Sequence, residues 1–278
     1  MLEDLSELSV AAAMRKRVRA QLKQEQRQQI QESEQSAANT PSKIGAQKMD
    51  AFYRSLRSHI LPLSSSSTVV EQIQRMLKVQ PPAEGKASKM KLALDKVFAI
   101  NCVGADAKFA PFARLPNRML LWKGARKSSI PSLLAQGLRV PAPEAPSAAY
   151  PFGKGIYLQD TAAVAALQCH MNEEGDTGLM MLCEVALGNS KEETKPSSSR
   201  RAPHTFHSLL GRGKVSHDPA DKVDIKLNET DAPLQAVVGM ALPDHGSKDS
   251  CVAHNQYVVF DTKQVLPRFL VQVTLSAQ

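Results

Sequence analysis

The sequence lacks the features of a membrane-spanning or secreted protein. No apolar run approaches 18 residues, so we expect no transmembrane helix. The segment from Met1 to Glu7 is acidic and lacks the apolar stretch of a secretory signal. It also differs from an Arg-rich, acid-poor mitochondrial presequence. We therefore expect an intracellular protein, and we prefer the cytoplasm or the cytoskeleton to the nucleus or the mitochondrion.

Cysteine is scarce, and its spacing excludes the common metal and redox motifs. The four cysteines, Cys102, Cys169, Cys183 and Cys251, form no C-x-x-C pair, which predicts a reduced protein with small buried thiols. His204 and His207 lie two residues apart, but no cysteine or acidic cluster is near them. We therefore predict no metal site.

The chain is long enough for one domain of ordinary size with an extension. It has 278 residues, of which 42% are hydrophobic, and its net charge of +8 makes acidic partners plausible. Much of the excess is local, because residues 15–27 carry six basic side chains and one acidic one. The basic residues are Arg15, Lys16, Arg17, Arg19, Lys23 and Arg27. This run fits an acidic protein surface or RNA, and it fits a solvated helix face about equally well.

Residues 8–35 favour a long helix, since they contain neither glycine nor proline and are rich in Ala, Gln, Arg and Glu. Their apolar residues are too sparse to bury a full stripe, and an isolated helix of this kind is marginal. We expect it to be held by a protein partner in a multi-subunit assembly, away from the remainder of the chain, or to be disordered alone. Residues 36–45 then predict a linker, with Pro41 and Gly45 as breakers.

Two amphipathic helices are expected next. Apolar residues at three- and four-residue spacing predict the first at about 47–61, ended by Pro62. Thr68 and Glu71 form a plausible capping box for the second, at about 68–79, which stops before Pro81. A further linker is expected up to about residue 85.

From residue 90 onward, short apolar alternations predict strands with few helices between them. The expected strands are 92–100, 118–122, 156–158, 178–187, 257–261 and 269–274. The expected helices are 129–136 and 160–169, and residues 188–203 predict a charged, Ser-rich loop. This order favours an α+β domain over alternating parallel units.

Several blocks in residues 90–275 resemble one enzyme family. They read Asn-Arg-Met-Leu-Leu-Trp-Lys-Gly-Ala-Arg at 117–126, Gly-Leu-Arg-Val-Pro-Ala-Pro-Glu-Ala-Pro at 137–146 and Phe-Gly-Lys-Gly-Ile-Tyr at 152–157. Further blocks are Leu-Cys-Glu-Val-Ala-Leu-Gly-Asn at 182–189, Gly-Arg-Gly-Lys at 211–214 and Asn-Gln-Tyr-Val-Val-Phe-Asp at 255–261. In this order, the blocks resemble the catalytic domain of the poly(ADP-ribose) polymerases, in the branch of the DNA-damage-type enzymes.

The resemblance implies a fold and a domain layout. It implies the diphtheria-toxin-like ADP-ribosyltransferase fold, with two packed, mostly antiparallel sheets and flanking helices. We divide the chain into a basic helical arm and linker at 1–45, truncated regulatory-type helices at 46–89 and a catalytic-like domain at 90–278.

The resemblance also implies an NAD pocket, but its His-Tyr-Glu triad is degenerate here. Lys123 stands in the place of the histidine and Gln256 in that of the glutamate, so only Tyr157 remains. A lysine ammonium donates hydrogen bonds but accepts none. A glutamine keeps the shape of the glutamate without its charge.

The remaining pocket positions are partly kept. Gly124 matches the glycine that binds the carboxamide, Tyr150 stands at the nearer stacking tyrosine, and Arg139 is a candidate phosphate contact. Ala165 falls at the carboxamide-binding serine, and Gln168 at the second stacking tyrosine. Each kept residue also has a structural interpretation, as a core tyrosine or a salt-bridged arginine.

Three functions stay open. The first, and preferred, is a pseudoenzyme that reuses the transferase fold as a structural or interaction subunit and needs no cofactor. The second is an NAD-dependent protein ADP-ribosyltransferase with an atypical active site. The third is a nucleotide or nucleic-acid binding module that uses the basic N-terminal segment, although this segment has no aromatic residues for base stacking.

Overall fold

The computed structural model describes residues 41–79, 87–198, 201–227 and 232–276 of the chain. Its helices are α2 (Pro41–Ser55), α3 (Thr68–Leu77), α4 (Ala105–Phe109), α5 (Ile130–Gln136) and α6 (Ala162–Ala166). Residues 56–278 form a compact unit separate from the unit that contains α2. The expected basic helix at 8–35 and the linker after residue 80 lie outside the described residues.

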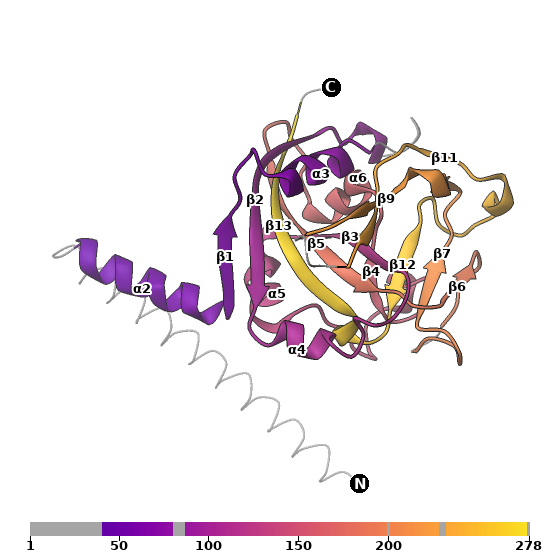
Figure 1. Ribbon diagram of the computed structural model, residues 1–278, viewed down its shortest axis with the longest axis horizontal. Helices are drawn as coiled ribbons and strands as arrows, with labels where there is room; N and C mark the ends of the chain where they lie inside the picture. The colour runs from indigo at the N-terminus through magenta and orange to yellow at the C-terminus, as the bar shows by residue number, and fades with distance from the viewer. Residues whose placement is uncertain (1–40, 80–86, 199–200, 228–231, 277–278) are drawn as a thin grey trace, which may run out of the picture. The chain divides into compact units, whose positions relative to one another are not determined.

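The strands of this unit form two main sheets (Figure 1) and one short antiparallel pair of strands that are not consecutive in the chain. The first sheet has the order β1-β2-β13-β5-β3-β10-β9, the second β4-β12-β7-β6, and the pair is β11-β8. Most neighbours are antiparallel, the exceptions being β3 with β10 and β6 with β7. The strands are β1 (Ser58–Pro62), β2 (Leu92–Cys102), β3 (Arg118–Ala125), β4 (Ile156–Leu158), β5 (Thr177–Ala186), β6 (Ser190–Glu193), β7 (Ser208–Gly211), β8 (Val215–His217), β9 (Lys222–Ile225), β10 (Leu234–Val237), β11 (Ala241–Pro243), β12 (Gln256–Val259) and β13 (Val265–Leu275).

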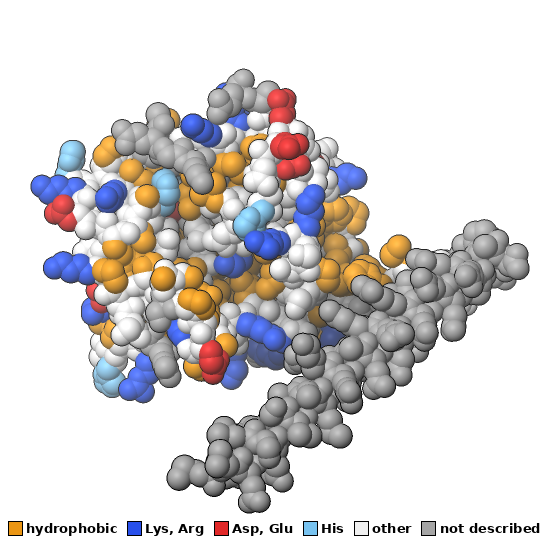
Figure 2. Space-filling model, turned by 180° about the vertical axis from the view of Figure 1, so that it is seen from behind, with side chains coloured by type: hydrophobic (Ala, Val, Ile, Leu, Met, Phe, Trp, Pro, Cys, Tyr) orange, Lys and Arg blue, Asp and Glu red, His pale blue; other side chains and the backbone are white. Residues whose placement is uncertain are grey.

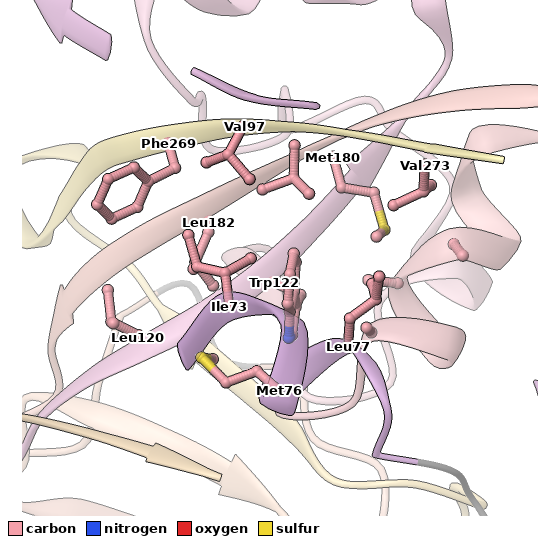
Figure 3. Close-up of a cluster of buried hydrophobic side chains, with 14 of the residues drawn as sticks. Ile73, Met76, Leu77, Val97, Leu120, Trp122, Met180, Leu182, Phe269 and Val273 are labelled. Carbon is pink, nitrogen blue, oxygen red and sulfur yellow. The ribbon is translucent and has the colours of Figure 1, made fainter. Parts of the chain in front are cut away.

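The first sheet is covered on both faces, which explains its long apolar strands. On one face, α3 and α6 pack over alternate residues of the central strands. Figure 3 shows Ile73, Met76 and Leu77 of α3 pointing at Trp122 and its neighbours on this face. On the other face, alternate residues such as Leu121 and Met181 pack against the second sheet. The expected α+β fold of two packed, mostly antiparallel sheets with flanking helices is therefore confirmed.

A buried ion cluster joins three neighbouring strands of the first sheet. The carboxylate of Glu184 on β5 is fully buried and binds Arg118 of β3 at 2.5 Å. Its other oxygen binds Arg268 of β13 at 2.6 Å. Two guanidinium groups therefore compensate one charge that would be very unfavourable alone.

Several expected bounds in the N-terminal half are wrong. The helix α2 begins at Pro41, because proline is tolerated in a first helical turn, and it passes through Gly45. It ends at Ser55, two residues before Arg57 adopts a left-handed φ of 49°. Residues 58–62 then form β1 beside β2, so the apolar Ile60 belongs to a strand rather than to the expected helix.

Smaller corrections concern a cap and a loop. The cap residue of α3 is Ser67, its side chain makes no capping hydrogen bond, and the expected capping box from Thr68 is not formed. The expected loop at 188–203 contains the strand β6, which pairs with β7. Cys251 is exposed, unlike the three other thiols.

No helix in the described ranges is long and apolar enough to cross a membrane.

Candidate functional site

A pocket of about 390 Å³ lies where the ends of β3, β4 and β12 meet the loop that precedes β4. It brings together the three triad positions, Lys123 from β3, Tyr157 from β4 and Gln256 from β12. Arg139, Tyr150 and Gln168 also line it. The structure therefore brings six of the eight predicted site residues together around one pocket.

Lys123 and Gln168, two of the four replaced positions, are joined by a hydrogen bond. The half-buried Lys123 Nζ donates a hydrogen bond of 2.9 Å to Gln168 Oε1. Burial lowers the pKa of the Lys123 ammonium from its ordinary value of 10.5, because water is excluded around the charge. No Asp or Glu is among the described residues that line this pocket. Lys123 is thus held by a neutral amide, without an ion pair there.

Gly124 and Ala165, the two predicted residues that do not line the pocket, pack tightly against each other. A Cβ at Gly124 would lie 1.8 Å from the backbone oxygen of Ala165. The backbone N–H of Trp122 donates a hydrogen bond of 2.7 Å to the Gln159 carbonyl, and its backbone C=O accepts one of 2.9 Å from the Gln159 N–H. The backbone N–H and C=O groups of successive residues point to alternate sides of a strand. Those of Gly124, two residues after Trp122, therefore also point away from β5. Only a glycine fits here, and its backbone groups lie on the edge of β3 that faces away from β5.

Tyr157 has a structural task. Its hydroxyl accepts a hydrogen bond of 2.9 Å from the Phe152 N–H and donates one of 2.7 Å to the Gly153 carbonyl. Burial raises the pKa of this hydroxyl to about 12, so it stays protonated. The Tyr150 ring lies 5.8 Å from the Tyr157 ring, tilted by 51°. Tyr157 therefore fixes the turn before β4, where Gly153 adopts a φ of 91°.

Two glutamine oxygens at the pocket lack partners. Gln256 Oε1 and Gln159 Oε1 are buried and accept no hydrogen bond from any residue that the structure describes, and both residues line the pocket. Buried polar atoms are rarely left this way, and such atoms often mark a binding site. Gln159 is a pocket residue that the sequence analysis missed, although it follows the expected strand directly.

A second polar cluster, also missed from the sequence, lies beside the pocket. The buried Asp160 accepts hydrogen bonds from Thr161 Oγ1 (3.1 Å), Asn255 Nδ2 (3.1 Å) and the Tyr257 hydroxyl (3.4 Å). His217 Nε2 lies 3.6 Å from Asp160 Oδ1 and 3.0 Å from Thr161 Oγ1. His217 Nδ1 faces the Gly239 carbonyl at 3.1 Å, so both ring nitrogens have acceptors. This arrangement suits an imidazolium paired with a carboxylate.

The titration of this cluster follows from that pairing. Burial raises the pKa of Asp160, but hydrogen bonds and the charge of His217 outweigh it, and the net pKa is lowered. Burial likewise lowers the pKa of His217, but Asp160 outweighs it, and the net pKa is raised. His254 nearby has a buried Nδ1 that has no partner within the described ranges, and burial lowers the pKa of this imidazole.

Comparison with known proteins decides the family. The model of the poly(ADP-ribose) polymerase catalytic domain matches residues 67–275, which is most of the chain. The chain belongs to this family.

Within the described ranges, no three His, Cys, Asp or Glu side chains gather to hold a metal ion.

Related polymerases share about a third of the residues. The chain is 33% identical to poly [ADP-ribose] polymerase 1 of Danio rerio over 230 residues, covering 83% of this chain and 22% of that protein. It is 34% identical to the Gallus gallus protein of the same name over 228 residues, covering 82% of this chain and 22% of the relative. The Arabidopsis thaliana protein of that name is 35% identical over 230 residues, with the same coverage of 82% and 22%. The chain thus spans about a fifth of the length of these relatives.

Proposed function

We propose that this member of the poly(ADP-ribose) polymerase catalytic-domain family is a pseudoenzyme. In this proposal, the transferase fold serves as a structural or interaction subunit of a larger assembly. The observation that carries it is the hydrogen bond between Lys123 and Gln168 in a pocket without a lining carboxylate. The proposal concerns this chain and not its longer relatives.

Charge is the first argument. In the chemistry that the family resemblance implies, the bond from ribose to nicotinamide breaks while positive charge develops on the sugar. The neutral Gln256 amide stabilises such a cation less than a carboxylate does, and a Lys123 ammonium would repel it. Losing one preorganised electrostatic group typically costs a factor of about 10²–10³ in rate. The charged groups of this pocket do not fit the transfer reaction of NAD.

Shape is the second argument. Gln168 stands where the resemblance puts the second stacking tyrosine, and its amide is bonded to Lys123. Ala165 is fully buried and has no hydroxyl to offer a carboxamide. Tyr150 and the backbone edge of Gly124 are the remaining parts of the ring-binding arrangement. These remnants support weak nucleotide binding at most, so NAD is not proposed as a resident cofactor.

The decisive experiment incubates the protein at high concentration with labelled NAD and acidic acceptor proteins. We expect neither NAD hydrolysis nor label transfer. The matched variant is Tyr150→Ala, since this half-buried ring lines the pocket and its hydroxyl holds no turn. Transfer by the wild type that disappears in this variant would refute the pseudoenzyme and favour the atypical transferase.

A restoration experiment tests whether the loss is confined to the triad. We expect the double variant Lys123→His, Gln256→Glu to stay inactive, because Ala165 and Gln168 still leave the ring without two of its contacts. Reacting groups must be placed within about 1 Å or better for efficient catalysis. Strong label transfer by the double variant would show that the rest of the pocket is competent.

The proposed partner is a protein of acidic surface, bound through the basic segment at 15–27. The face in Figure 2 shows Lys and Arg spread among apolar and neutral side chains rather than gathered in one patch. This spread gives the folded unit no obvious nucleic-acid track on that face. Pull-down of the partner by the full chain should weaken with added salt and fail when Arg15, Lys16 and Arg17 are changed to Gln. Unchanged capture by this variant would refute the role of the segment.

A further inference from the structure

We infer that Lys123 is a nucleophilic amine that captures small anionic carbonyl compounds as an imine within the pocket. The compound class is an aldehyde, or the open-chain form of a sugar, that carries a phosphate group. This inference goes beyond the proposed function, since it needs no NAD chemistry.

The setting of Lys123 differs from those of Lys191 and Lys127. Its Nζ is half-buried and donates to a neutral amide oxygen, Gln168 Oε1. Lys191 instead forms an ion pair of 2.7 Å with Glu193. The exposed Lys127 donates to the Thr177 hydroxyl at 3.0 Å. Lys123 therefore combines access to a pocket with the absence of a lining carboxylate that would hold it as an ammonium.

Burial further favours the reactive form of this amine. Only a neutral amine has a lone pair for attack, and burial lowers the pKa of Lys123. The nearby thiols of Cys169 and Cys183 have pKa values raised by burial, so they are protonated at neutral pH and provide no counter-charge. A lysine in such surroundings is the type that forms imines with carbonyl compounds.

The other lining residues select the ligand. The exposed Arg139 lies on the same pocket and can bind a phosphate group. Gln159 and Gln256 add neutral polar side chains to the lining, which suit a hydroxylated compound. The volume of about 390 Å³ suits a small molecule rather than a peptide. These groups together fit a hydroxylated carbonyl compound with an anionic end.

The reaction balances without a further reagent. The lone pair of Nζ attacks the carbonyl carbon, a C–N bond forms, and the C=O π electrons move to oxygen, which takes a proton from the amine. The resulting carbinolamine loses its hydroxyl together with the remaining N–H proton as water, and a C=N bond forms. Aldehyde and amine thus give imine and water, with no change in oxidation state.

Reductive trapping tests this inference on the full chain. The protein is treated at neutral pH with pyridoxal 5′-phosphate or ribose 5-phosphate in the presence of cyanoborohydride, and labelled lysines are mapped by mass spectrometry. We expect Lys123 to carry on the order of tenfold more label than the exposed Lys127, and to keep its label to lower pH. Pyridoxal without the phosphate should label Lys123 several-fold less, because it cannot bind Arg139.

Two variants sharpen the test. Lys123→Arg keeps a hydrogen-bond donor for Gln168 Oε1 but removes the nucleophilic amine, so the extra label should vanish while thermal unfolding stays close to that of the wild type. Arg139→Gln should remove most of the preference for the phosphorylated aldehyde. Labelling of wild-type lysines in proportion to their exposure, with Lys123 at or below Lys127, would overturn the inference. That outcome would leave the proposed loss of NAD chemistry untouched, because the latter is read from label transfer alone.

Discussion

The two faces of the β4–β12 strand pair differ sharply in how their polar groups are satisfied. In the observed register, Tyr257 pairs with Leu158, so Asn255 and Asp160 follow on one face. Asp160 on that face has a full set of partners, including His217. Gln159 and Gln256 point to the other face, into the pocket, and each has an amide oxygen without a partner. Adjacent residues therefore belong to two different networks. We call the face of Asp160 and Asn255, where the hydrogen bonds are satisfied, the saturated face. We call the face of Gln159 and Gln256, where two acceptors are unsatisfied, the unsaturated face.

This difference separates stability from binding. A fully paired buried network holds one arrangement, whereas an unpaired buried acceptor costs stability unless a ligand satisfies it. The saturated face supports the strands that form the pocket, whereas the unsaturated face carries two acceptors without partners among the described residues. The fold can thus persist while the chemistry of the pocket changes, as the proposed function requires.

The largest expected effect is on the saturated face. We expect Asp160→Ala to lower the free energy of unfolding by about 3–5 kcal/mol, because it leaves the buried His217 without its counter-charge. Denaturant unfolding followed by circular dichroism measures the loss. The matched change on the pocket face, Gln159→Met, removes an unpaired oxygen and should cost far less. Equal losses in the two variants would contradict the distinction between the faces.

A second pair of variants compares Asn255, which directly precedes β12, with Gln256, the first residue of β12. Asn255→Leu removes the acceptor of the Gly213 N–H (2.9 Å) and a donor to Asp160, and should cost about 2–3 kcal/mol of unfolding free energy. Gln256→Leu loses an acceptor that binds no group in the described part of the chain, and should change stability by less than about 1 kcal/mol. Thermal unfolding of the two variants under identical conditions is the measurement. A greater loss from the Gln256 change would mean that its oxygen is paired in solution.

The smallest effect is a pair of opposite pH dependences. The folded pKa of His217 is raised above 6.5, so its contribution is present below 6.5 and is lost as pH rises through the folded value. The pKa of His254 in the folded state is lowered. The unfolded chain therefore binds a proton at this residue first, and His254 reduces stability as pH falls below 6.5. His217→Gln should therefore make stability fall more steeply on acidification between about pH 8 and 5, and His254→Gln less steeply. Slopes that shift in the same direction would refute the two assignments.

Much of the fold could be predicted because its central strands carry local signals. The long apolar strands β2, β5 and β13 were expected within a few residues, and β4 at its observed bounds. The strand β1 was missed because Ile60 continues the helical spacing of the preceding apolar residues, and only pairing with β2 makes it a strand. Short strands such as β6 have polar sequences, so distant partners rather than local preference determine them.

The site was predicted unevenly for a related reason. The pocket residues Lys123, Tyr157 and Gln256 lie in blocks that resemble the family, so their proximity could be inferred from that resemblance. His217 reaches Thr161 from 56 positions away, and no local pattern reveals such a contact. The bond between Lys123 and Gln168 also depends on how α6 and the turn after it lie on β3, since the two residues are 45 positions apart.

The position of β13 has a consequence for how the chain folds while it is being synthesised. This strand is the last described one, yet it lies between β2 and β5 in the first sheet (Figure 1). Before residues 265–275 leave the ribosome, β2 and β5 each present an open edge, and the first sheet exists at most as two fragments. Open edges invite pairing with other chains. Two edges of the first sheet therefore stay unpaired until the last strand is made, and any truncation before Val265 should yield an aggregating product rather than a smaller folded one.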